Sequence, residues 1–186
     1  MKNKYHIFNP IISESVKIVG AGKIKIGPFS VIDDYVLLDS GISKSSTLVV
    51  GKRSKIKQGA ILRTYDGEIS IGDRVSIGEY SVIAGHGKTT IGNCTIIAGH
   101  CNISAANHIY ACAEIMRFQG ETAIGITIGD NVWIGTNSSI LDGVYIGNGC
   151  VIGAGSVVTH DLPPNCVCCG VPCRVLREKK LNIDML

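Results

Sequence analysis

The sequence predicts an all-β fold, a parallel β-helix built from six-residue repeats, because three features recur together. From residue 128 onward an aliphatic residue returns at every sixth position, and these residues are Ile128, Ile134, Ile140, Ile146, Ile152 and Val158. The next residue is usually glycine, as at Gly129, Gly135, Gly147 and Gly153. The fifth residue of each repeat is small or β-branched, as at Val132, Ser138, Val144, Cys150 and Ser156. Neither the 3.6-residue period of an α-helix nor strand alternation gives a period of six.

A short strand followed by a turn, repeated three times, bends a chain around a triangular coil. The aliphatic residue then points to the axis and stacks on its counterpart one coil away, and each coil covers the strand edges of the next. Glycine after the aliphatic residue relieves crowding where the chain turns. Earlier segments repeat the pattern with breaks, at Ile71, Ile77 and Ile83, at Ile91, Ile97 and Ile103, and more weakly from Ile26 to Leu62.

The largest break separates Ile103 from Ile128. With Thr122 taken as the start of a repeat, the break predicts an extruded loop over about residues 109–121. We expect one domain over residues 1–186, with a β-helix at about 18–162 and a C-terminal tail at 163–186. Leu162-Pro163-Pro164 is expected to close the coil, and the tail from Arg174 is expected to form a short helix.

Composition excludes several classes of function. The chain has 186 residues, of which 45% are hydrophobic and only 5% aromatic, so aliphatic and small residues must fill the core. The formal net charge of +3 and the absence of a dense basic run argue against nucleic-acid binding. No stretch has the apolar length of a membrane span. The first fifteen residues contain no secretory signal, so we expect a cytoplasmic protein.

Eight cysteines are therefore expected to be reduced. Cys94, Cys101 and Cys150 stand where small buried residues are expected. The segment from Cys166 to Cys173 holds four cysteines and resembles a zinc clip, but its spacing is irregular and no second cluster follows. We expect no metal ion.

Several residues are predicted to face outward near the breaks. His108 is the sixth residue of the repeat that begins at Ile103, at the mouth of the extruded loop, where functional groups are often placed. From the residues alone, a structural role for His108 is equally open. His86, in the turn before Lys88, is the rival histidine, and His100 and His160 are weaker candidates.

Two further positions define a face of the coil. Trp133 is the only tryptophan and also occupies a sixth, outward position. Thr136 and Ala154 are both third in their repeats, one coil apart, so they should stack. Such a face presents backbone N–H groups in a row, although ordinary coil stacking explains the spacing equally well.

The C-terminal half carries the motifs of a known family. Ile128-Gly-Asp-Asn-Val-Trp-Ile-Gly, Val151-Ile-Gly-Ala-Gly-Ser-Val-Val-Thr, Pro163-Pro-Asn and Gly170-Val-Pro-Cys-Arg-Val resemble the sugar O-acetyltransferases of the hexapeptide-repeat superfamily, the galactoside, maltose and nodulation-factor group. The detailed match covers about residues 103–178. The resemblance implies a left-handed β-helix, a homotrimer, and acetyl-CoA bound between neighbouring copies.

The resemblance also assigns roles to single residues. It implies that His108, after Asn107, is the catalytic base, that Trp133 belongs to the cofactor site, and that backbone groups at Thr136 and Ala154 hold the pantetheine arm. Arg174 and Arg177 match basic residues near the CoA phosphates, whereas His160 replaces a common lysine. The chain lacks the helical N-terminal segment with which galactoside-type members contact the acceptor. Its acceptor contacts are therefore unknown, with His86 and Asn107 as candidates.

The implied reaction moves an acetyl group from acetyl-CoA to a sugar or polysaccharide hydroxyl. A thioester is already activated, so the enzyme need only position and deprotonate the acceptor, and histidine, with an ordinary pKa near ~6.5, suits this task. Glu114 is a possible orienting residue by position. Two alternatives remain open: an N-acetyltransferase of an amino-sugar nucleotide, and a non-catalytic β-helix that serves as a scaffold.

Overall fold

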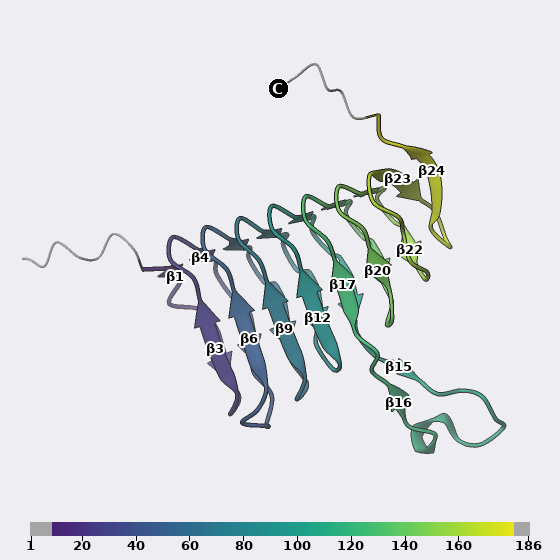
Figure 1. Ribbon diagram of the computed structural model, residues 1–186. Helices are drawn as coiled ribbons and strands as arrows, with labels where there is room; N and C mark the ends of the chain where they lie inside the picture. The colour runs from purple at the N-terminus through teal and green to yellow at the C-terminus, as the bar shows by residue number, and fades with distance from the viewer. Residues whose placement is uncertain (1–8, 181–186) are drawn as a thin grey trace, which may run out of the picture.

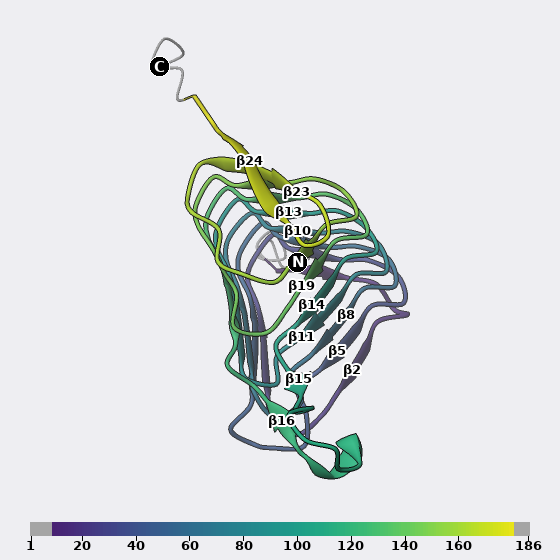
Figure 2. The ribbon, with the colours of Figure 1, turned by 90° about the vertical axis from the view of Figure 1, so that its right-hand side faces the viewer.

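The computed structural model describes residues 9–180, and they form a parallel β-solenoid with three sheets and one protruding arm (Figure 1). The view along the axis shows a triangular outline with the coils stacked behind one another (Figure 2). The predicted all-β fold is confirmed. The segments 1–8 and 181–186 lie outside the described residues, and these include the last part of the predicted helical tail. No helix in residues 9–180 is long and apolar enough to cross a membrane.

Each sheet contributes one face of the prism. Sheet A contains, in spatial order, β1 (Ile11–Ile12), β4 (Val31–Ile32), β7 (Lys55–Ile56), β10 (Ser76–Ile77), β13 (Ile96–Ile97), β18 (Trp133–Ile134), β21 (Val151–Ile152), β23 (Cys166–Cys169) and β24 (Arg174–Glu178). Sheet B contains β2 (Lys17–Val19), β5 (Leu37–Asp39), β8 (Ile61–Arg63), β11 (Val82–Ala84), β14 (Asn102–Ser104), β19 (Ser139–Ile140) and β22 (Val157–Val158). Sheet C contains β3 (Lys23–Ile26), β6 (Thr47–Val50), β9 (Glu68–Ile71), β12 (Lys88–Ile91), β17 (Ile126–Ile128) and β20 (Tyr145–Ile146).

The core is a set of aliphatic columns along the axis. In sheet A, Ile77 pairs with Ile97, Ile97 with Ile134, and Ile134 with Ile152, and each is at most 1% exposed. Burying such a side chain stabilises the fold by roughly 1.5–3 kcal/mol. The predicted inward residues from Ile128 to Val158 are all buried, so the six-residue pattern is confirmed. In the first coils the columns are open, and Ile26 is only partly buried.

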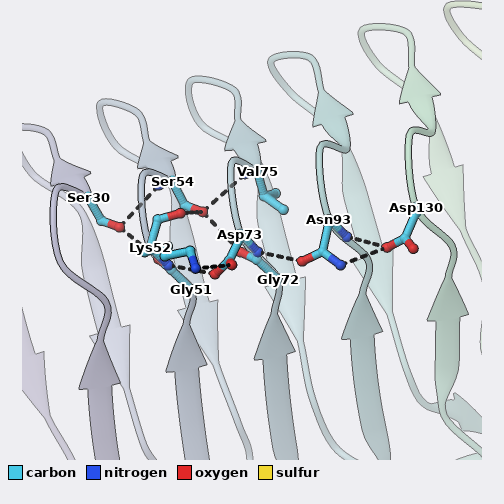
Figure 3. Close-up of polar contacts among 9 residues, drawn as sticks. All are labelled: Ser30, Gly51, Lys52, Ser54, Gly72, Asp73, Val75, Asn93 and Asp130. Atoms are coloured by element: carbon cyan, nitrogen blue, oxygen red, sulfur yellow. Dashed lines mark hydrogen bonds and ion pairs between the residues drawn. The ribbon is translucent and has the colours of Figure 1, made fainter.

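Two polar ladders hold the turns between sheets C and A (Figure 3). Asp73 Oδ1 accepts the N–H of Lys52 at 2.9 Å, and Asn93 Oδ1 accepts the N–H of Asp73 at 2.9 Å. Inside the turn, Ser54 Oγ donates to the carbonyl of Gly72 and accepts the N–H of Val75, each at 3.0 Å. Ser54 thus bonds the next coil from within a narrow corner, where only a small or β-branched side chain is found. Cys94, predicted to be buried, is exposed, because it lies in such a turn with φ of 56°.

The arm is more ordered than the extruded loop that the sequence predicts. It begins with β15 (Asn107–His108) and ends with β16 (Glu121–Thr122), which pair antiparallel, and a short 3₁₀ helix, η2 (Met116–Phe118), lies near its tip. Thr122 does not begin an inward repeat, because it pairs with Asn107 at the base of the arm. The buried residue that restarts the coil is Ile126.

Both predicted ends of the β-helix need correction. The first described strand is β1, so the coil begins before residue 18. At the other end, β23 continues sheet A beside β21, and β24 folds back antiparallel on β23. The segment that was expected to be helical is thus a strand from Arg174 to Glu178. Alternating burial in β23, with Cys166 and Cys168 inward, lets it cap the last coil.

Candidate active site

His108 lies at the base of the arm, opposite an acidic residue that the sequence did not single out. The antiparallel register of β15 and β16 places His108 directly across from Glu121. The distance from His108 Nδ1 to Glu121 Oε1 is 3.5 Å, and the two side chains are 67% and 47% exposed. Glu121 is therefore close enough to orient the imidazole ring. Glu114, the predicted orienting residue, is exposed farther along the arm, where its carbonyl accepts a bond from Gln119.

Asp142 fixes the base of the arm to the coil. Its Oδ2 accepts bonds from the Thr122 hydroxyl and the Ile124 N–H, both at 3.1 Å, and its Oδ1 accepts the Gly125 N–H at 2.8 Å. In the sequence, Asp142 follows Leu141, which occupies a position where the six-residue pattern usually has glycine. The missing glycine was the only feature of the sequence that pointed to a special role for Asp142.

Two hollows adjoin His108. The arm hollow, about 570 Å³, is lined by His108, Met116, Arg117 and Glu121. The edge hollow, about 250 Å³, lies where sheet B turns into sheet C, and its lining includes His86, Asn107 and His108. The imidazole of His108 thus borders space on two sides, and both proposed acceptor candidates share the edge hollow with it.

The other histidines have different surroundings. His86 stacks on Tyr65 with ring centroids 3.9 Å apart, and its Nδ1 is buried with no hydrogen-bond partner among the described residues. His100 stacks on Tyr80 at 5.5 Å. His160 Nδ1 lies 2.7 Å from the hydroxyl of Thr159. Among the described histidines, only His108 has a ring nitrogen within 4 Å of a carboxylate oxygen.

A separate groove brings together three residues that the sequence grouped. Trp133, Thr136 and Ala154 line an almost wholly apolar groove of about 390 Å³, together with Ala98 and Val151. Trp133 is 53% exposed and pairs with Val151 of the next coil. We refer to this as the Trp133 groove. It runs along the edge where sheet A turns into sheet B.

Arg174 and Arg177 lie beyond one end of the Trp133 groove. Within sheet A, Val151 pairs with Val167, and Val167 pairs with Arg177. Arg174 pairs with Cys169 and donates to the carbonyl of Cys173 at 2.9 Å. Both arginine side chains are exposed. Arg177 thus follows Val151 and Val167 across sheet A, whereas Arg174 lines a separate hollow with His160 and Asp161.

Within one copy of the chain, the Trp133 groove does not lie beside His108. The Trp133 groove follows the edge between sheets A and B, whereas the arm leaves the edge between sheets B and C. Viewed along the axis, the arm projects outward from its own corner (Figure 2). The predicted cofactor residues and the predicted base thus form two half-sites on different edges of the prism.

The C-terminal cysteines form a buried cluster of thiols. Cys150 Sγ lies 3.2 Å from Cys166 Sγ, which lies 3.1 Å from Cys168 Sγ. Burial raises the pKa of the Cys150 thiol to about 11, and it also raises the pKa values of Cys166, Cys168 and Cys173. These thiols are therefore held protonated, which makes them poor nucleophiles. Within residues 9–180, no group of three or more His, Cys, Asp or Glu is arranged to hold a metal ion.

Comparison with known proteins finds similarity to transferases over part of the chain. The family described as bacterial transferase hexapeptide (six repeats) matches residues 125–160. Galactoside O-acetyltransferase of Escherichia coli (strain K12) is 59% identical over 64 residues, which are 34% of this chain and 32% of that protein. The chain thus matches about a third of the length of this curated relative.

Two solved structures resemble most of the chain. A galactoside acetyltransferase in complex with coenzyme A is 29% identical, with a TM-score of 0.50, over 88% of this chain and 65% of its own. A mutant of AntD, an N-acyltransferase from Bacillus cereus, was solved in complex with dTDP-4-amino-4,6-dideoxyglucose and coenzyme A. It is 21% identical, with a TM-score of 0.62, over 95% of this chain and 87% of its own, a likeness in fold.

Proposed function

We infer that the protein is an acetyl-CoA-dependent acetyltransferase, because residues 125–160 match the hexapeptide repeat of the bacterial transferases. Its acceptor is a hydroxyl group of a sugar or polysaccharide. The observation that carries the proposal is His108 at the base of the arm, with Glu121 3.5 Å away and two hollows beside the pair. The galactoside O-acetyltransferase relative supports the choice of acceptor class.

The Trp133 groove suits the pantetheine arm of acetyl-CoA. Its lining is almost entirely apolar, which favours a flexible chain with few charges. Backbone N–H groups near Thr136 and Ala154 supply bonds for the pantetheine amides. We assign Arg174 and Arg177, on strand β24 of the same sheet, to the phosphates, which arginine binds through charge-assisted hydrogen bonds.

His108 acts as the general base. Its unprotonated imidazole takes the proton of the acceptor hydroxyl as the oxygen attacks the acetyl carbonyl carbon. The tetrahedral intermediate then collapses, the carbon–sulfur bond breaks, and the imidazolium returns the proton to the departing CoA thiolate. Glu121 orients the ring and stabilises the imidazolium that forms between the two steps. No acyl-enzyme is required, and the buried thiols take no part.

Because the two half-sites lie on different edges, a complete site requires a second copy. A homotrimer of parallel prisms sets the His108 edge of one copy beside the Trp133 groove of the next. The exposed Trp133, Ile96 and Tyr145, each about half exposed, give the prism faces apolar surface for such contacts. Light scattering should therefore report a trimer, and a stable, active monomer would refute the shared site.

Complementation tests the shared site more directly. His108→Ala removes the base, and Ala154→Trp fills the groove, so each variant alone should be inactive. Co-expression yields mixed trimers in which an intact His108 of one copy faces an intact groove of another, and activity should return. If both variants assemble but their mixture stays inactive, each copy has its own complete site.

An acceptor screen tests the reaction itself. Purified protein is presented with acetyl-CoA and either hydroxyl sugars, amino-sugar nucleotides or no acceptor, and CoA thiol release is measured. We expect release with hydroxyl sugars. Release only with amino sugars would favour the N-acetyltransferase, whose fold AntD shares. A scaffold would give neither release nor thermal stabilisation by CoA.

A further inference from the structure

A third hollow lies on the same edge of the solenoid as His108, closer to the N-terminus. Its volume is about 480 Å³, and its lining includes Asp39, Arg63, Tyr65 and Asp66. Asp39 ends β5, Arg63 ends β8, and the parallel register sets these two residues side by side. Tyr65 and Asp66 lie in the turn that follows β8. We call this the Arg63 hollow, and none of the residues proposed above for catalysis lines it.

The turn that carries Tyr65 and Asp66 has an unusual backbone. Their φ angles are 48° and 71°, and within residues 9–180 they are the only two consecutive non-glycine residues in the left-handed region. Such conformations concentrate where a fold positions functional groups. Asp66 Oδ1 accepts the N–H groups of Ile42 and Ser43, both at 2.8 Å. The turn is thus fixed against the neighbouring coil before any ligand arrives.

A stacked pair of rings joins the Arg63 hollow to the edge hollow beside His108. Tyr65 lines the former and His86 the latter, and their rings lie 3.9 Å apart at 14°. Arg63 pairs with Ala84, and Ala84 with Ser104, which also lines the edge hollow. Two coil steps of about 4.8 Å separate Arg63 from Ser104, roughly 10 Å in all. A ligand that fills both hollows must be about two sugar rings long.

The polar groups of the Arg63 hollow suit a neutral, hydroxyl-rich ligand. Arg63 Nε donates to Asp39 Oδ2 at 2.9 Å, so the guanidinium charge is already balanced. Asp66 then leaves an excess of one negative charge, which disfavours a phosphate group. Arg63 still offers N–H donors, the two carboxylates offer acceptors, and the 43% exposed Tyr65 offers an apolar edge. Sugar hydroxyls need both donors and acceptors beside such a surface.

We propose that Asp39, Arg63, Tyr65 and Asp66 form a second acceptor subsite that binds a neutral sugar residue about 10 Å along the solenoid from the edge hollow beside His108. The preferred acceptor is therefore at least a disaccharide, or a longer glycan, and neither a free monosaccharide nor a nucleotide-linked sugar. This inference rests on the proposed function for the site of transfer. The subsite itself is a property of the Arg63 hollow.

Acceptor length provides the kinetic test. The wild-type protein should have a kcat/KM for disaccharides and trisaccharides at least about tenfold above that for the matching monosaccharide, the size expected for one charged hydrogen bond. Tyr65→Ala and Arg63→Ala should remove this advantage and leave the monosaccharide value within about twofold. Arg63→Lys, which keeps the charge but loses the planar fork, should give an intermediate loss.

The matched control is Tyr80→Ala, because Tyr80 also stacks on a histidine and is similarly exposed, but on the edge between sheets A and B. It should leave the preference for longer acceptors unchanged. Equal efficiency with all acceptor lengths would overturn the subsite, as would equal losses on short and long acceptors in Tyr65→Ala. Highest efficiency with a nucleotide sugar would overturn it as well.

Calorimetric binding of a trisaccharide separates this inference from the proposed function. The wild-type protein should bind it without acetyl-CoA, and Tyr65→Ala should weaken binding by about tenfold. Binding that depends on Tyr65 in a protein that transfers no acetyl group would keep the subsite and overturn the proposed function. Transfer to monosaccharides by a protein that does not bind the trisaccharide would overturn the subsite and keep the proposed function.

Discussion

Replacing Gly51 with alanine should open the contact between two neighbouring coils. Gly51 follows β6 at the turn into sheet A, and its φ is not in the left-handed region, so alanine meets no backbone strain of its own. A Cβ at this position would lie 2.5 Å from the carbonyl carbon of Gly72 and 2.6 Å from Asp73 Oδ1. The glycine is therefore required by the close approach of the next coil.

The size of the effect follows from these contacts. Overpacking against backbone atoms costs about 1–3 kcal/mol, and the reduced freedom of the unfolded chain returns about 0.4–1 kcal/mol. If the coils separate, the bonds from Gly51 N–H to Ile71 and from Lys52 N–H to Asp73 weaken, at about 1 kcal/mol each. We expect a net loss of about 2–3 kcal/mol, which lowers the melting temperature by roughly 5–10 °C.

Urea unfolding and thermal melting followed by circular dichroism measure this loss. Gly99→Ala is the matched control, because Gly99 also has an ordinary φ but its Cβ would meet no atom nearer than the Glu79 carbonyl oxygen at 3.1 Å. Its stability should stay within about 1 kcal/mol of the wild type. A Gly51→Ala protein as stable as Gly99→Ala would refute the role of coil contact.

Three further outcomes are expected. Burial raises the pKa of Cys150 to about 11, so the native state keeps this proton to higher pH than the unfolded chain does. The free energy of unfolding should therefore fall by on the order of 2 kcal/mol between pH 9 and pH 11. Urea titrations should show a smaller fall for Cys150→Ala. Arg174→Ala should raise the KM for acetyl-CoA with less change in kcat. Lys180→Ala, the control, should change neither value. An unchanged KM in Arg174→Ala would show that Arg174 does not contact acetyl-CoA. Asp142→Ala removes three bonds at the base of the arm and should lower kcat; at about 1 kcal/mol per bond it should also lower the melting temperature by roughly 5–10 °C, and full activity would show that the arm needs no anchor.

The regular part of the fold could be predicted because one physical requirement repeats. Every inward aliphatic residue from Ile128 to Val158 faces the same narrow axis, so the sequence must place an aliphatic residue at every sixth position. The arm and the C-terminal strand β24 obey no such period. Their form depends on antiparallel pairings, of His108 with Glu121 and of Val167 with Arg177, which a six-residue pattern does not encode.

The same difference explains which parts of the site were predicted. Trp133, Thr136 and Ala154 share a groove because equal positions in consecutive coils stack. The Arg63 hollow joins Asp39 to a residue 24 positions later, across coils of irregular length. Such neighbours become visible only when the number of residues in each coil is known.

The kcat of His108→Ala tests the central claim most directly. Loss of a general base should lower kcat by roughly 10²–10⁴, while the melting temperature and the stabilisation by CoA stay near the wild-type values, because the side chain is exposed. His86→Ala, in the neighbouring turn, should be milder. A His108→Ala protein that keeps more than about a tenth of wild-type kcat, beside an inactive His86→Ala protein, would contradict the account.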